Sequence, residues 1–118
     1  MILVDTSVWI DFLRTGNPLL SELLEKGQVC THPLVLGELS SGNISKRNNF
    51  LNLFSDLPSA KEATHQEVIT FINSNKTFGK GVGYFDHMLL CSAIISDNPL
   101  WTLDKRLMSL ARKHATVP

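Results

Sequence analysis

The chain opens with a continuous apolar run, Ile-Leu-Val at 2–4, that stops abruptly at a carboxylate, Asp5. Such a run is typical of a strand buried on both faces in a parallel α/β sheet. Open sheets of this kind bind ligands outside the carboxyl ends of their strands, which makes Asp5 a candidate site residue. Asp5 could equally be the N-cap of the helix that continues through Val8 and Phe12. The opening stretch alone leaves both interpretations open.

Strand and helix patterns alternate along the rest of the chain. Apolar runs at 28–31 and 100–103 predict two more strands, and weaker edge strands are expected around residue 60 and at 115–117. This alternation predicts an α/β fold with three layers (α/β/α) and a short, mostly parallel central sheet. The expected helices run from Asp5 to the break at Gly16, over 18–26, from Pro33 through Leu39, from a cap at Ser45 to Pro58, over 65–75, over 84–95 and over 105–113.

The totals set further bounds on the class of protein. A chain of 118 residues is expected to form a single domain over 1–118, large enough to fold without disulfides. Eleven basic and eleven acidic residues give no net charge, which argues against binding of nucleic acid through an overall positive charge. The absence of a secretory signal, of a membrane-length apolar run and of more than two cysteines predicts a cytoplasmic protein with reduced thiols.

Four acidic residues stand at positions that need an explanation. Asp5 and Asp104 follow strands, and parallel strands end at one rim of a sheet. Helical periodicity puts Glu38 on a stripe that should be buried, where an unpaired carboxylate is costly. Asp86 is expected on the inward side of the first turn of a very apolar helix, although it could simply complement the helix dipole there. Together the four acids are expected to share one rim.

Carboxylates gathered in this way repel one another unless a cation joins them. Oxygen ligands without cysteine or histidine favour Mg²⁺ or Mn²⁺ over zinc. Such a site suits cleavage of a phosphodiester bond by metal-activated water, with the four acids as metal ligands and catalytic residues. The neighbouring hydroxyls of Thr6, Ser7 and Thr102 are expected to orient these ligands, although capping would explain each hydroxyl equally well.

Nearly the whole chain resembles the PIN-domain ribonucleases, and within them the VapC-type toxins of bacterial toxin–antitoxin systems. The resemblance implies that Asp5, Glu38, Asp86 and Asp104 hold Mg²⁺ or Mn²⁺, with Thr6 or Ser7 and Thr102 as auxiliary hydroxyls. It also implies an endoribonuclease that forms a homodimer and is inhibited by a cognate antitoxin protein. The most specific matching segments are Ile-Leu-Val-Asp-Thr-Ser-Val-Trp-Ile-Asp at 2–11, Leu-Gly-Glu-Leu at 36–39, Gly-Tyr-Phe-Asp at 83–86 and Leu-Trp-Thr-Leu-Asp-Lys-Arg-Leu at 100–107.

Three cations are candidate contacts to RNA. Lys105 and Arg106 follow Asp104 directly, and neutralising both should weaken RNA binding and flatten its salt dependence. Lys80 lies in a glycine-rich segment at 79–83 that lacks the context of a phosphate-binding loop and is interpreted as a flexible connector.

Two other classes remain beside the nuclease. One is a non-catalytic PIN-like binding module whose acidic groove holds a structural cation or a partner's arginine. The other is a small phosphotransfer protein, which ranks last because no acidic pair follows the first strand.

Overall fold

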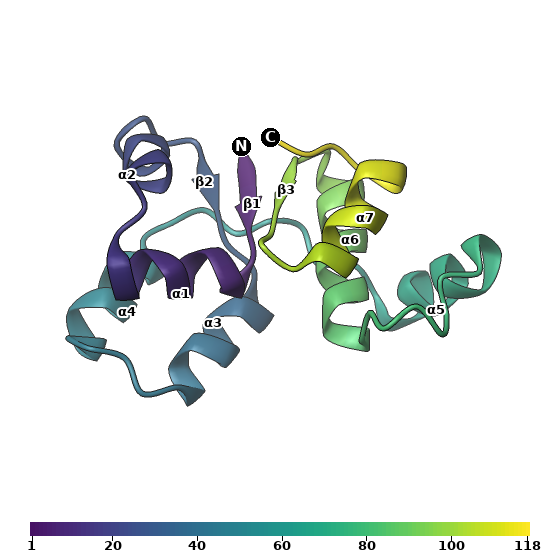
Figure 1. The fold of residues 1–118 in the computed structure, drawn as a ribbon, viewed down its shortest axis with the longest axis horizontal. Coiled ribbons are helices and arrows are strands. Elements are labelled where there is room, and N and C mark those ends of the chain that lie inside the picture. Colours follow the sequence, from purple (N-terminus) through teal and green to yellow (C-terminus); the bar gives the residue numbers. More distant parts are fainter.

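The computed structural model describes residues 1–118, with a three-stranded sheet between two groups of helices (Figure 1). The strands β1 (Ile2–Val4), β2 (Val29–Cys30) and β3 (Leu100–Trp101) are all parallel, in the order β2-β1-β3. The predicted parallel sheet is therefore confirmed. The helices are α1 (Thr6–Thr15), α2 (Pro18–Glu25), α3 (Pro33–Ser41), α4 (Arg47–Ser55), α5 (His65–Asn75), α6 (Tyr84–Ser96) and α7 (Lys105–His114).

The sheet separates two helical layers, which confirms the three-layer prediction. Figure 1 shows α1 to α4 on the β2 side of the molecule and α6 and α7 on the β3 side, with α5 outermost beside α6. In the first layer Trp9 is fully buried and packs edge-on against Phe50 and Phe54 of α4. In the second, the middle of α6 is buried, including Leu90 and Ala93. Each strand is followed by a helix, so that α1, α3 and α7 all begin just beyond the carboxyl ends of the strands.

Three local predictions were wrong. Helix α4 is capped by Lys46 rather than Ser45, and Lys46 takes a left-handed φ of 51°. The edge strand expected near residue 60 is a single bridge between Thr31 and Ser59, and the strand expected at 115–117 does not form. Short edge segments gain too few hydrogen bonds to make a ladder. The chain end still contributes one bond, from the Leu100 N–H to the Thr116 carbonyl at 2.8 Å.

The cysteines and the helix lengths agree with expectation. Both thiols, of Cys30 and Cys91, are free and buried. None of the seven helices combines the length and the apolar character needed to cross a membrane.

The capping box at the start of α5 forms as predicted. The Thr64 hydroxyl accepts the Glu67 N–H at 3.1 Å, and the Glu67 carboxylate accepts the Thr64 N–H at 2.9 Å. Replacing Thr64 with alanine should therefore lower the free energy of unfolding by about 1 kcal/mol in urea denaturation. The exposed mid-helix Thr70 is the control, because Thr70→Ala removes no cap and raises helix propensity. Equal destabilisation by the two variants would contradict the capping role.

Candidate acidic site at the strand ends

Asp5 follows β1 and is the most enclosed of the four acids. Its side chain is only 6% exposed, and one carboxylate oxygen, Oδ2, accepts the hydroxyls of Ser7 and Thr102, each at 2.7 Å. Asp5 does stand at the N-cap position of α1, but its side chain makes no capping bond there. The alternative that its carboxylate merely caps the helix is therefore wrong. The geometry leaves Oδ1 without a protein donor.

The hydroxyls of Ser7 and Thr102 link the carboxyl ends of β1 and β3, which we call the acidic rim together with the four acids. Thr102 is fully buried, and its Oγ1 also accepts the Asp104 N–H at 3.0 Å. The Ser7 Oγ accepts the Leu103 N–H at 3.0 Å. These bonds fasten the segment after β3 to the carboxyl end of β1. The two hydroxyls predicted to orient Asp5 thus contact it directly.

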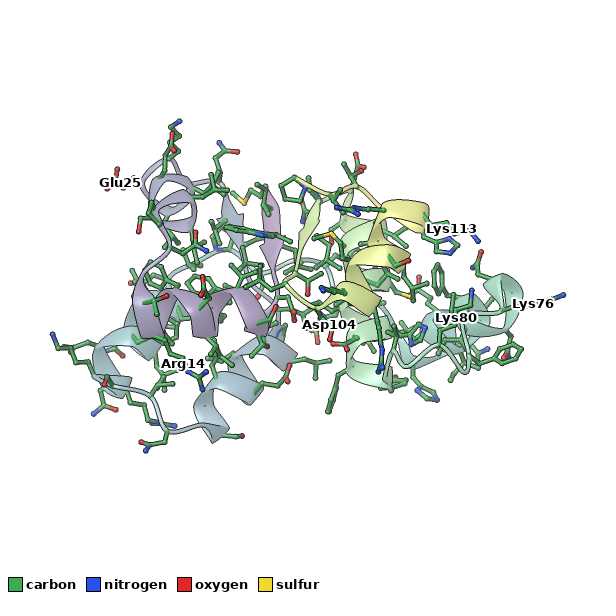
Figure 2. All side chains as sticks on the ribbon, in the orientation of Figure 1. Arg14, Glu25, Lys76, Lys80, Asp104 and Lys113 are labelled. Atoms are coloured by element: carbon green, nitrogen blue, oxygen red, sulfur yellow. The ribbon has the colours of Figure 1, made fainter.

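Asp104 lies beyond β3, which ends at Trp101 and is shorter than predicted. Asp104 is the N-cap of α7, where its Oδ1 accepts the N–H groups of Arg106 and Leu107 at 2.9 and 3.0 Å. Figure 2 shows Asp104 at the middle of the molecule, where the two helical layers meet. Capping occupies one oxygen of this carboxylate and leaves Oδ2 without a protein donor.

Glu38 is exposed, so the prediction that it lies on the buried stripe of its helix was wrong. The buried side of α3 is formed by Val35 and Leu39, and Glu38 lies beside it. The Glu38 Oε1 accepts the Thr6 hydroxyl at 3.0 Å, which joins α3 to the first turn of α1. Glu38 therefore reaches the rim from the solvent side.

Asp86 lies within electrostatic reach of the other three acids. Partial burial, and then the negative charges of Asp5, Asp104 and Glu38 in that order, raise the pKa of Asp86 from 3.8 to about 6. The charges that act on this carboxyl are all negative, and the single salt bridge of the molecule, between Lys26 and Glu22, involves none of the four acids. The four acids thus form no salt bridge within the molecule.

The four acids do not form a preorganised metal-binding site. No three acidic, histidine or cysteine side chains are arranged closely enough to hold one metal ion among them. The donor set nevertheless fits Mg²⁺ or Mn²⁺, because these ions are commonly held by one or two carboxylates and keep several waters. Free oxygens on Asp5 and Asp104 and the repulsion felt by Asp86 both favour a cation here. The metal-ligand roles stay a prediction.

The three candidate RNA contacts are separated by the fold. Lys105 and Arg106 are exposed at the start of α7. Burial and the charges of Lys113 and Lys80 lower the pKa of His114, which places Lys80 towards the far end of α7. Figure 2 agrees, with Lys80 on the α5 side and apart from Asp104. Sequence reasoning missed the contact described below between Arg106 and the glycine-rich segment.

The fold and the rim together define an α/β domain with an acidic site at the carboxyl ends of a parallel sheet. The PIN domain family model matches residues 2–113. The chain is 44% identical over 108 residues to "Ribonuclease VapC32" of Mycobacterium tuberculosis, in the strains CDC 1551 / Oshkosh and ATCC 25618 / H37Rv. Each match covers 91% of this chain and 87% of the relative. The chain therefore belongs to the PIN domain family and, within it, to the VapC-type proteins.

Proposed function

We propose that this protein is a divalent-metal-dependent endoribonuclease, the toxin of a toxin–antitoxin pair, formed by one PIN-like domain over residues 1–118. The observation that carries the proposal is the hydrogen-bonded site at the strand ends, where Thr102 links Asp5 to the Asp104 backbone and Thr6 tethers Glu38. The pKa of Asp86, raised first by burial and then by the charges of the other three acids, agrees with this grouping. The relatives with 44% identity are named as ribonucleases, which supports the same reaction class.

Each side chain then has a defined task. Asp5, whose Oδ2 is fixed by Ser7 and Thr102, would hold a Mg²⁺ or Mn²⁺ ion together with Asp86 and Asp104. Glu38, tethered by Thr6, adds a carboxylate on the solvent side that can bind a second ion or a metal-bound water. A bound divalent cation would polarise the phosphodiester and lower the pKa of the attacking water. No side-chain nucleophile is required.

The same proposal includes partners and location. RNA is the substrate, with Lys80, Lys105 and Arg106 as candidate contacts to its phosphates. A cognate antitoxin protein would inhibit the toxin by covering the acidic rim, where an arginine of the partner would neutralise the uncompensated carboxylates. We further propose that the protein acts in the cytoplasm as a homodimer.

Removing the metal tests the proposal. Purified protein treated with EDTA should leave a broad panel of RNAs intact, and Mg²⁺ or Mn²⁺ added in excess should restore cleavage by about 100-fold or more, because a Lewis acid contributes several kcal/mol. The readout is the new RNA ends, resolved on denaturing gels. Undiminished cleavage in EDTA would contradict a metal-dependent reaction.

The binding module is the second candidate, favoured by the absence of three side chains arranged to hold one ion. It predicts a different result in the same assay. No RNA of the panel would be cut at any metal concentration, while the protein would still bind an arginine-bearing partner.

A further inference from the structure

Arg106 rests against Gly81, a residue of the segment that the sequence suggested to be a flexible connector. A Cβ placed on Gly81 would stand 2.8 Å from Arg106 Nη1, 2.9 Å from Cδ and 3.1 Å from Cζ. The first two separations are shorter than real Cβ contacts and the third is tight, so a side chain at position 81 would force the Arg106 side chain to shift. Gly81 also has a φ of +78°, in the left-handed region that favours glycine.

The contact between Arg106 and Gly81 lies next to Asp104, one of the four acids. The Arg106 N–H donates to Asp104 Oδ1, so Arg106 begins at the rim through its own backbone. Gly81 lies two residues before Gly83, the N-cap of α6, whose first turn carries Asp86. The Arg106 side chain therefore connects the start of α7, which carries Asp104, with the segment that leads into α6, which carries Asp86.

The charge of Arg106 is not used inside the molecule. Its guanidinium forms no salt bridge, since the single ion pair of the molecule joins Lys26 and Glu22. Arg106 is exposed, so a guanidinium that rests against Gly81 with its donors free can bind an external anion. Arginine in this state suits phosphate, because its planar fork can donate two parallel hydrogen bonds.

We propose that Gly81, which has no side chain, leaves the space in which the Arg106 side chain lies. Arg106 is thereby positioned to bind a phosphate of the RNA strand next to the bond that is cleaved. Arg106 contacts the RNA, and Gly81 is a positioning residue that acts only through Arg106. This inference rests on the proposed function, because the anion is taken to be the backbone of the same RNA that reaches the acidic rim.

The loop supplies a matched control. Gly79 also has a left-handed φ, of +72°, but a Cβ placed there would meet nothing within 4 Å. Gly79→Ala and Gly81→Ala therefore impose similar backbone strain two residues apart, and only Gly81→Ala displaces Arg106. Thermal melting of both variants checks that each is folded.

The experiment measures binding of a labelled single-stranded RNA of about 12 nucleotides by fluorescence anisotropy in EDTA, so that binding is separated from cleavage. Arg106→Ala should weaken binding about tenfold and lower the slope of log Kd against log salt by about one. Gly81→Ala should reproduce most of this loss, and Gly79→Ala should not. In the Arg106→Ala background, Gly81→Ala should add nothing, because the residue through which it acts is gone.

Steady-state cleavage in Mg²⁺ gives a second readout, in which Gly81→Ala and Arg106→Ala should raise KM more than they lower kcat. The inference is overturned if Gly81→Ala and Gly79→Ala bind RNA equally well, if the two losses add in the double variant, or if the wild-type protein binds no RNA. Metal-dependent cleavage that survives in all variants with unchanged KM would overturn the inference and leave the proposed function standing. Lack of cleavage by the wild-type protein, with binding that still depends on Gly81 and Arg106, would overturn the proposed nuclease instead.

Discussion

Asp5→Asn should reduce metal-dependent RNA cleavage by about 100-fold or more while leaving the fold intact. The amide oxygen of asparagine can still accept the hydroxyls of Ser7 and Thr102 that now reach Oδ2. What disappears is the negative charge at Oδ1, which is the part of the side chain proposed to hold the cation. Loss of several kcal/mol of metal-dependent stabilisation of the transition state corresponds to this factor, at 1.36 kcal/mol for each tenfold change in rate.

Asp97→Asn is the matched control for this experiment. Asp97 is exposed, follows α6 and precedes β3, so it lies at the opposite end of the strands from Asp5. Its left-handed φ of 54° is one that asparagine tolerates well. Cleavage by this variant should equal that of the wild-type protein. If Asp5→Asn cleaved RNA at the wild-type rate, with Mg²⁺ restoring activity after EDTA as before, the acidic rim would not be the site.

Much of this site could be predicted because it depends on where strands end. The apolar run before Asp5 fixed the end of β1, and parallel pairing then placed the segment before Asp104 on the same rim. Alternation and caps, such as the Thr64 box, were equally local signals. These features need only neighbouring residues to be correct, and neighbouring residues are what a sequence displays.

What could not be predicted depends on contacts between distant segments. Periodicity put Glu38 inside the protein, but the angle at which α3 packs buries Val35 and Leu39 and turns Glu38 towards Thr6. The role of Gly81 was missed because a glycine in a polar segment is as typical of a flexible connector as of a close approach by another side chain. Only the position of α7 shows that the missing side chain leaves space for Arg106. A left-handed conformation at a single loop glycine leaves no periodic signal in the sequence.

The charge at Asp86 makes the free energy of unfolding depend on pH in a direction opposite to that of an ordinary salt-bridged acid. Its pKa is raised from 3.8 to about 6 in the folded protein, so folding favours the protonated form. The stabilisation from that proton is complete below the unfolded pKa of 3.8 and is lost as the pH rises through about 6. At neutral pH without metal, the folded state therefore carries an unfavourable charge.

Asp86→Asn should consequently raise the free energy of unfolding in EDTA by about 2 kcal/mol at neutral pH, a value already reduced for the partial exposure of the carboxyl. The gain should shrink towards zero as the pH falls from 6 to 3.8, because the wild-type side chain is then also neutral. Urea denaturation across this range measures the difference, and Asp97→Asn should show no such trend. Excess Mg²⁺ should reverse the order, since only the intact acidic rim gains the full binding energy of the cation. A constant difference between Asp86→Asn and the wild type at every pH would contradict the repulsion among the four acids from which the site was inferred.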